Sequence, residues 1–366
     1  MEFCVSLGSK IISMKYLFIV QGEGRGHLTQ AISLYEMLTK NGDEVVGVLV
    51  GKSKSMTLPA FFQEKVPCPI SFFISPHLVF SSDNKKTLFF KSISYNLKKT
   101  FVYLKNIRFL REKINKSDAD VVVNFYEVLT GFTYAFSHPK VPYICIAHQY
   151  LLLHPDFIFP KKSKIELAGL KFLTRLSCVR ASRLLALSFK EMRNVKKLCV
   201  VPPLLRKEVL QKTPTDGDYM LGYMVNTGFS EEIIKWHQTH EDIPLHCFWN
   251  NKETPAELVI NKNLTFHQLN DTLFLDYMAG CRAYASTGGF ESICEAMYLQ
   301  KPVMMIPAHI EQECNVLDAM NAGAGIASPE FNLTTLLDYL PNYKPNTAFA
   351  GWVHKAKSMF LDLLKI

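Results

Sequence analysis

The 366-residue sequence lacks the features that mark membrane-spanning and secreted proteins. It contains no apolar run near the roughly 20 residues that a helix needs to cross a bilayer. Residues 1–13 have neither an apolar core nor a cleavage signature, so we expect no secretory signal. Nine cysteines, an odd number without a Cys-x-x-Cys pair, indicate buried thiols in a reducing compartment. Together these absences predict a cytoplasmic protein.

Charged residues are also few, and the sequence has no low-complexity segment. Charged residues make up only 20% of the chain, whereas hydrophobic residues make up 48%, with 26 Phe and 15 Tyr. This composition excludes a disordered protein. The length predicts about two domains, and the apolar content suffices for a core in each.

A glycine-rich loop near the N-terminus lacks the spacing of a dinucleotide fingerprint. A buried strand at Tyr16–Val20 leads into Gly22–His27, then into a helix over Leu28–Lys40 and a strand over Glu44–Val50. This order predicts a Rossmann-like βαβ unit. No acidic residue ends the second strand, so the loop does not indicate NAD binding.

The chain also lacks a convincing Asp-x-Asp metal site. Asp118-Ala119-Asp120 has the right letters but precedes the strand Val121–Val123 instead of following it. We therefore expect these carboxylates to cap that element, and we expect neither a metal ion nor a cofactor.

What the sequence does contain is a second glycine turn, at Thr287–Gly289. The following helix carries Phe290, Ile293, Cys294 and Met297 at i, i+3, i+4 and i+7, which predicts one buried face. A glycine turn at a helix N-terminus leaves N–H groups pointing outward beside the positive end of the helix dipole, and so forms an anion site. Glu295 lies about one turn beyond Ser292, within reach of a ribose diol. The stretch therefore suggests a nucleotide diphosphate.

This stretch resembles the donor-binding signature of the UDP-glycosyltransferases and of the lipid-linked N-acetylglucosaminyltransferase of peptidoglycan synthesis. The shared positions follow one order along the chain: Gly289, Ser292, Glu295, Gln300-Lys301-Pro302, Pro307, Glu311-Gln312 and Asn315. Two of the family's residues are replaced, because Thr287 stands where many members have His and Gln300 where Gly usually precedes Lys-Pro. The loop Gly22–His27 also resembles the first loop of these families, with Gly24 and Gly26 on the acceptor side.

The resemblance implies an α/β fold with two Rossmann-like domains facing a cleft, the arrangement called GT-B. Residues 14–203 would form the acceptor-side domain, residues 204–345 the donor domain, and residues 346–366 a helix that returns to the first domain. The implied activity is inverting, metal-independent transfer from a nucleotide sugar, expected to be a UDP-sugar, to a glycan or lipid-linked acceptor in cell-surface glycan biosynthesis.

The resemblance also assigns roles to individual residues. His27 would be the general base. The backbone of Thr287, Gly288, Gly289 and Phe290, with the Ser292 hydroxyl, would hold the diphosphate. Glu295 would bind the ribose, and Glu311 and Gln312 the sugar.

Three further positions are candidates. The family places an Asp near the end of the strand that begins at Val121, where it orients the catalytic His; Asn124 and Glu127 are the counterparts here, and the sequence does not choose between them. His148 follows the strand Val141–Ala147, at the edge where sites gather. In the second half, Asn226-Thr227-Gly228 follows a strand and precedes a helix, which offers more N–H groups to a phosphate.

Two basic, aromatic-rich segments account for much of the formal net charge of +8. Residues 85–116 hold ten Lys or Arg against one acid, and residues 161–183 hold seven against one. Such segments predict contact with an anionic membrane surface. The alternative is that they are solvated amphipathic helices packed on the first domain. Because no nucleic-acid motif accompanies them, we expect no nucleic-acid partner.

Two other functions remain open at this point. A nucleotide-sugar 2-epimerase shares the two-domain architecture but needs no acceptor. A membrane-associated partner subunit without catalytic activity is the second alternative, and Thr287 in place of His favours it.

Overall fold

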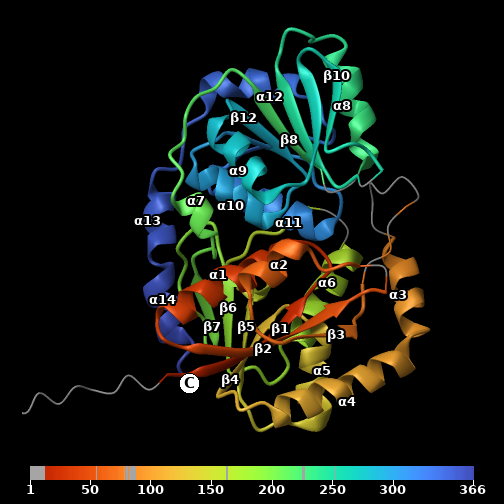
Figure 1. The fold of residues 1–366 in the computed structure, drawn as a ribbon, viewed down its shortest axis with the longest axis vertical. Coiled ribbons are helices and arrows are strands. Elements are labelled where there is room, and N and C mark those ends of the chain that lie inside the picture. Colours follow the sequence, from red (N-terminus) through yellow and green to blue (C-terminus); the bar gives the residue numbers. More distant parts are fainter. Residues whose placement is uncertain are drawn as a thin grey trace, which may run out of the picture.

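The computed structural model describes residues 13–366 except 55, 78, 80, 82–87, 162–163, 225–226 and 252. It contains two seven-stranded sheets, one formed by the first half of the chain and one by the second. The two halves lie one above the other, with helices between them and around them (Figure 1). This arrangement confirms the predicted α/β fold with two Rossmann-like units.

The first sheet has the strand order β3-β2-β1-β4-β5-β6-β7, and all its strands are parallel. Its central strands are almost completely buried because helices cover both faces, which explains their continuous apolar sequence. The strands are β1 (Lys15–Gln21), β2 (Glu44–Lys52), β3 (Ile70–Ile74), β4 (Val121–Phe125), β5 (Tyr143–Ala147), β6 (Arg183–Leu187) and β7 (Leu198–Val201).

The second sheet has the order β10-β11-β9-β8-β12-β13-β14 and is parallel except where β10 pairs with β11. A separate cluster of buried residues, with Trp236 and Phe266 among them, fills part of this half. The strands are β8 (Met220–Met224), β9 (Leu245–Trp249), β10 (Glu257–Asn261), β11 (Leu264–Gln268), β12 (Ala283–Ser286), β13 (Val303–Met305) and β14 (Gly325–Ala327).

Helices connect the strands in both halves. In the first half they are α1 (Gly26–Lys40), α2 (Ala60–Lys65), α3 (Phe89–Leu97), α4 (Thr100–Lys116), α5 (Val128–Ser137) and α6 (Lys164–Ser177), with a 3-10 helix η1 at His148–Leu153. In the second they are α7 (Lys207–Leu210), α8 (Ser230–His237), α9 (Asp271–Gly280), α10 (Phe290–Tyr298), α11 (Ile310–Asn321) and α12 (Thr334–Tyr339), with 3-10 helices η2 (Thr227–Phe229) and η3 (Leu340–Asn342). The chain ends with α13 (Ala348–His354) and α14 (Ala356–Leu363).

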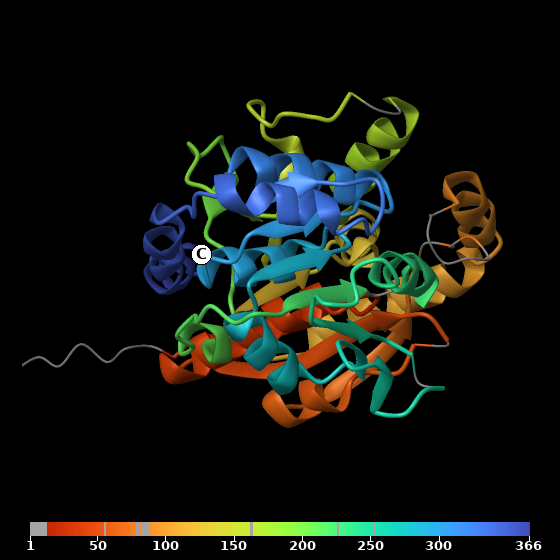
Figure 2. The same ribbon diagram turned by 90° about the horizontal axis from the view of Figure 1, so that it is seen from above.

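The last two helices pack against the first half of the chain. The Trp352 indole donates a hydrogen bond of 2.9 Å to the Ser188 carbonyl oxygen. Arg183 donates bonds of 2.6 and 2.7 Å to the carbonyl oxygens of Leu363 and Lys365. Viewed from above, these helices lie at one side of the molecule, opposite α3 (Figure 2). The domain boundaries at residues 203–204 and 345–346 remain predictions.

The sequence patterns differ from the structure at a few elements. The terminal helix expected over Ala348–Leu364 is interrupted at Lys355, which separates α13 from α14. The helix after the second glycine turn was expected to bury one stripe, but α10 also buries Ser292 and Glu295 because it lies between the two halves. In the described residues, no helix is long and apolar enough to span a bilayer.

Candidate active site

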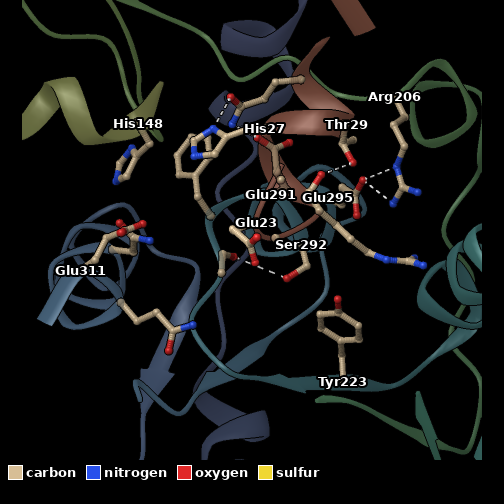
Figure 3. A pocket seen from close by; sticks show the side chains of 18 of the residues that line it. Glu23, His27, Thr29, His148, Arg206, Tyr223, Glu291, Ser292, Glu295 and Glu311 are labelled. Carbon is tan, nitrogen blue, oxygen red and sulfur yellow. Dashed lines mark hydrogen bonds and ion pairs between the residues drawn. The ribbon is translucent and has the colours of Figure 1, made fainter. Parts of the chain in front are cut away.

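A cavity of about 250 Å³ lies between the two halves of the molecule. It is bounded by the β1–α1 loop, the turn before α9 and the N-terminal turns of α10 and α11. Figure 3 shows His27, Glu291 and Ser292 gathered around this space. The lining residues include Glu23, Gly24, Arg25, Gly26, His27, Thr29, Gln30, His148, Gln149, Arg206, Tyr223, Gly289, Phe290, Glu291, Ser292, Glu295, His309, Glu311, Gln312 and Asn315.

The β1–α1 loop needs its glycines for two different reasons. Gly24 has φ +92°, a conformation that side chains with a Cβ rarely adopt. A Cβ on Gly26 would lie 3.3 Å from Cγ of Glu291, so this glycine lets the second half approach the loop closely. The loop thereby delivers His27 as the second residue of α1, at the edge of the cavity.

His27 has its closest polar neighbour on its own helix. Its Nδ1 lies 3.3 Å from Oε1 of Gln30, and its ring stacks on Tyr126 with the ring centroids 5.7 Å apart. Burial lowers the pKa of His27, although the negative charge of Glu311 and the contact with Gln30 oppose the shift. The imidazole is therefore neutral near pH 7, which is the form that accepts a proton.

Gln30 connects His27 to the other half of the molecule through its side-chain amide. Its Nε2 donates a hydrogen bond of 2.5 Å to Oε1 of Glu291, the second residue of α10. Burial raises the pKa of Glu291 to about 8. The other oxygen, Oε2, is buried and has no hydrogen-bond partner among the described residues.

Two further polar contacts hold the halves together around the cavity. Arg25 forms an ion pair of 2.8 Å with Asp271 at the start of α9. Gln149 donates a bond of 2.8 Å from Nε2 to Oε1 of Glu311 at the start of α11.

The N-terminus of α10 forms the expected turn. Gly288 has φ +60°, and a Cβ there would lie 2.9 Å from Cγ2 of Val316. Gly289 precedes the first helical turn, and no side chain caps that turn. The Ser292 hydroxyl has only long contacts, 3.5 Å to the Gly289 carbonyl oxygen and 3.5 Å to the Ser286 hydroxyl. The first-turn N–H groups of α10 and this hydroxyl are thus available to a ligand. Thr287 is buried beneath the turn.

Glu295 is buried one turn further along α10 and pairs with Arg206. Its Oε1 accepts a hydrogen bond of 2.7 Å from Nε of Arg206, which lies in the connection before α7, and forms an ion pair of 2.6 Å with Nη2. Asp271 lies 3.8 Å from the same guanidinium. Burial raises the pKa of Glu295, and Arg206 opposes the shift.

The structure corrects the expectation that Asn124 or Glu127 orients His27. Both oxygens of Glu127 accept from the Ser75 hydroxyl, at 2.7 and 2.8 Å, and Oε1 also caps α5 through the Leu129 N–H. Asn124 donates to the carbonyl oxygens of Glu127 and Ser177. Both side chains are buried, Asn124 in β4 and Glu127 just before α5, and Gln30 takes the place beside His27.

His148 lines the cavity but is almost completely buried. Its Nδ1 lies 2.7 Å from the Leu187 carbonyl oxygen, and its ring stacks on Phe290 at 4.1 Å between centroids. Its Nε2 lies 4.0 Å from Asp318. Burial lowers the pKa of His148 to about 4, so the ring is neutral.

Of the remaining residues predicted to bind the donor, two line the cavity and two are not fully described by the structure. Glu311 and Gln312 line the cavity, and Oε1 of Gln312 accepts a bond of 2.8 Å from the Ala308 N–H. Thr227 begins η2, and only its backbone is described. Asn226 lies outside the described residues, as do Lys85 and Lys86 of the first basic segment.

Several lining residues were not predicted. Gln30 follows His27 by one helical turn, so the period of α1 could have indicated it. Arg25 and Glu23 lie inside the loop that the sequence singled out. Arg206 follows the Pro202-Pro203 pair, but its contact with Glu295 joins positions 89 apart in the sequence, and no local pattern announces it.

The Asp118-Ala119-Asp120 run lies away from this cavity. Asp120 accepts a bond of 2.8 Å from the Lys15 N–H at the start of β1, and Asp118 pairs with the Lys15 ammonium. These carboxylates hold the beginning of a neighbouring strand. Within the described ranges, no group of three or more His, Cys, Asp or Glu is placed to hold a metal ion.

Comparison with known proteins gives a consistent result. A family model described as glycosyl transferase family 1 matches residues 14–343. Among curated proteins, no sequence matches. The chain is similar in fold to the glycotransferase of kitacinnamycin, with 15% identity and a TM-score of 0.60 over 95% of this chain and 99% of that one.

Two other solved structures share the fold. UGT2 of Phytolacca americana, complexed with UDP-2fluoro-glucose and pterostilbene, is 11% identical with a TM-score of 0.61 over 96% of this chain and 94% of that one. MurG of Acinetobacter baumannii is 14% identical with a TM-score of 0.53 over 96% of this chain and 99% of that one.

Proposed function

Because this chain belongs to glycosyl transferase family 1, we propose that it transfers a sugar from a UDP-sugar to a hydroxyl of a glycan or lipid-linked acceptor. The transfer inverts the anomeric configuration and requires no metal ion. One observation carries the proposal: a neutral imidazole from one half and an uncapped helix N-terminus from the other line the same cavity.

The reaction needs a base, an electrophile and a stabilised leaving group. Nε2 of His27 takes the proton of the acceptor hydroxyl while the hydroxyl oxygen attacks the anomeric carbon. The bond from that carbon to the diphosphate oxygen breaks, and its electron pair leaves with UDP. The products are the glycoside, UDP and protonated His27. A general base of this kind contributes about 10²–10⁴-fold to the rate.

The donor side of the site stabilises negative charge without a cation. N–H groups in the first turn of α10 and the Ser292 hydroxyl bind the diphosphate, aided by the helix dipole. Each preorganised donor of this kind is worth about 3–4 kcal/mol in the transition state. Thr287 stands where related sequences place an imidazole, but it is buried beneath the turn, so Ser292 and the backbone carry the charge.

Residues beyond the phosphate cradle complete the proposed nucleotide-sugar site. Glu295 lies one turn along α10 from Ser292 and binds the ribose hydroxyls, while Glu311 and Gln312 contact the sugar from α11. The similar Phytolacca americana structure is complexed with UDP-2fluoro-glucose.

The test is a panel of nucleotide sugars in buffer with EDTA. We expect one UDP-sugar to raise the Tm of the protein more than ADP- or GDP-sugars do, and to release UDP slowly by transfer to water. Product NMR with an added acceptor should give the inverted anomer. Activity that disappears in EDTA and returns with Mg²⁺ would contradict the metal-free mechanism, and interconversion of the donor sugar without UDP release would indicate the epimerase.

Exposed apolar residues on the acceptor-side half support the proposal that the acceptor arrives from a membrane surface. On α3 and α4, Phe90, Leu97 and Phe101 are exposed by 75%, 68% and 82%. On α6, Ile165 and Phe172 are exposed by 67% and 59%. Exposed cations lie on the same helices or directly beside them: Lys91, Lys98, Lys105, Arg108, Lys164 and Arg175. We define these residues as the basic apolar surface.

The fold explains why this surface is left exposed. The helix α4 buries Tyr103, Ile107 and Leu110 against the first half, so its opposite side faces solvent. The helices α3 and α6 lie on the same side of the molecule in Figures 1 and 2. Apolar side chains among cations match an anionic lipid surface, which accepts both. This match supports a lipid-linked acceptor that approaches the acceptor-side half.

Vesicle binding tests the basic apolar surface. We expect sedimentation with phosphatidylglycerol vesicles but not with phosphatidylcholine vesicles, and loss of binding in the double variant Leu97→Ser and Phe101→Ser. Phe136→Ser is the matched control, because Phe136 is exposed by 71% but lies on α5, outside this surface. Equal binding by both variants would contradict the assignment.

A further inference from the structure

His27, the proposed base, contacts Gln30, and Gln30 in turn bonds to Glu291 on the other side of the cleft. We propose that Gln30, itself fixed by Glu291 from the other half, is the positioning residue that sets the tautomer of His27, so that the base is formed when the cleft closes. The proposal rests on the proposed function for its catalytic meaning. Its structural content concerns only Gln30, Glu291 and His27.

The contact with Gln30 decides which imidazole nitrogen carries the proton. The carbonyl oxygen Oε1 of Gln30 can only accept a hydrogen bond, and it lies 3.3 Å from Nδ1 of His27. Nδ1 therefore carries the hydrogen in the neutral ring, which leaves a lone pair on Nε2. If the amide were reversed, its NH₂ group would face Nδ1, the hydrogen would move to Nε2, and that nitrogen could no longer act as a base.

Glu291 determines which way the amide points. Its Oε1 accepts from Nε2 of Gln30 at 2.5 Å, so the amide nitrogen faces α10 and the amide oxygen faces His27. A reversed amide would set its oxygen against the oxygens of the ionised Glu291 carboxylate. Oε1 of Glu291 remains an acceptor in either charge state, since a proton bound to Glu291 can reside on the unpartnered Oε2.

This arrangement exists only while the two halves are in contact. Gln30 lies on α1 and Glu291 on α10, which are 261 residues apart in sequence. The absent side chain of Gly26 makes room for Glu291, because a Cβ there would lie 3.3 Å from its Cγ. The same turn of α10 carries the diphosphate cradle. Donor-side closure and base formation are thus linked by one hydrogen bond.

Other groups near His27 do not replace Gln30. Tyr126 stacks against the ring, and Glu311 faces it electrostatically from α11 without a hydrogen bond between them in the described structure. Asn124 and Glu127 are occupied by Ser75, Ser177 and the backbone of α5. Gln30 is therefore the group whose removal should alter the tautomer.

Nitrogen-15 NMR of the histidine side chains tests this without any substrate. The His27 signals are assigned by comparison with His27→Gln. In the wild-type protein we expect Nδ1–H and an unprotonated Nε2 at pH 8. In Gln30→Leu, which keeps the size but removes the acceptor, we expect a shift toward Nε2–H and a lower pKa of His27. In Gln30→Glu the carboxylate should retain Nδ1–H and raise that pKa.

Turnover supplies the second measurement, with UDP release to water from the best UDP-sugar of the panel. We expect Gln30→Leu to lower kcat at least about tenfold, part of the about 10²–10⁴-fold that a general base supplies, while KM for the donor changes little. Glu36→Gln is the matched control on α1, because it removes a 3.2 Å ion pair with Lys207 but touches neither His27 nor the cavity.

The outcomes separate this inference from the proposed function. If His27→Gln turns over like the wild type, the base assignment itself is wrong. If His27→Gln is inactive but Gln30→Leu keeps the wild-type tautomer, pKa and kcat, the positioning role is wrong and the proposed function stands. Circular dichroism and Tm of each variant confirm that the fold is retained before these comparisons are made.

Discussion

Arg206 contacts a single oxygen of Glu295: Nε donates a hydrogen bond of 2.7 Å to Oε1, and Nη2 forms an ion pair of 2.6 Å with the same atom. Arg206 comes from the connection between the halves, so the residue proposed to bind ribose is held by the segment that joins the two sheets.

Replacing Arg206 by Met should destabilise the protein strongly. The change leaves Glu295 buried without its cation, and breaking a buried ion pair in this way costs about 3–5 kcal/mol. Urea unfolding measures the difference. Arg193→Met is the control, because Arg193 pairs with Asp156 at the exposed surface, where such pairs contribute about 0–1 kcal/mol. Equal effects would show that burial does not distinguish the two pairs.

Replacing Glu295 by Ala should weaken UDP binding. Hydrogen bonds to a charged group contribute about 1.5–3 kcal/mol, which corresponds to a rise of roughly 10- to 150-fold in the Kd. Isothermal titration calorimetry with UDP measures it. An unchanged Kd would remove Glu295 from the proposed ribose site.

Replacing His27 by Ala should abolish transfer while the donor still binds, because His27 is proposed to act on the acceptor proton. The expected loss in kcat is about 10²–10⁴-fold. The wild-type rate should fall only at acidic pH, because the base works unprotonated and burial lowers the pKa of His27 below its ordinary value. A rate that falls as pH drops through 7 would contradict this assignment.

Replacing Glu127 by Gln should change how stability depends on pH. Burial raises the pKa of Glu127 from the ordinary 4.5 to about 7, so the native state binds a proton that the unfolded chain has already released between these values. The wild type therefore loses stability relative to Glu127→Gln as pH rises from about 4.5 to about 7, by about 3 kcal/mol at most. Urea unfolding of both proteins across this range checks the sign, and parallel curves would exclude a raised pKa.

Replacing Gly288 by Ala should disturb the anion-binding turn. Its φ of +60° strains any residue with a Cβ, and the added atom would lie 2.9 Å from Val316. We expect a loss of about 1–3 kcal/mol in stability and weaker UDP binding. Gly351→Ala is the control, since Gly351 lies in α13 with open space around it. That change should instead stabilise by about 0.5–1 kcal/mol.

Much of the fold could be predicted from local patterns. Continuous apolar runs such as Tyr16–Val20 and Val121–Val123 correspond to buried parallel strands, because a sheet covered on both faces requires them. The edge strand β10 (Glu257–Asn261) was missed, although it contains the short apolar run Leu258–Ile260. Its residues are exposed or half-buried, so at this edge of the sheet an apolar run does not correspond to burial.

The parts of the candidate site that lie within a single glycine-rich loop were predictable from the sequence. The loops at Gly24–His27 and Gly289–Ser292 are short, and their residues reach the cavity together. The contacts between Gln30 and Glu291, and between Arg206 and Glu295, were not predictable, because each joins segments that are distant in the sequence. Asn124 and Glu127 were candidates for the partner of His27 because of their position in the chain, but Glu127 accepts from Ser75 and Asn124 donates to the Ser177 carbonyl oxygen.

The chain passes between the two halves twice, once at the connection that contains Arg206 and once before α13, and both crossings lie on the same side of the molecule (Figure 1). Because both crossings lie on one side, we expect the halves to open by a swing about that side. Such a swing widens the cleft on the opposite side, where α3 and α6 lie. A substrate that arrives from the basic apolar surface would then enter at the widest part of the opening.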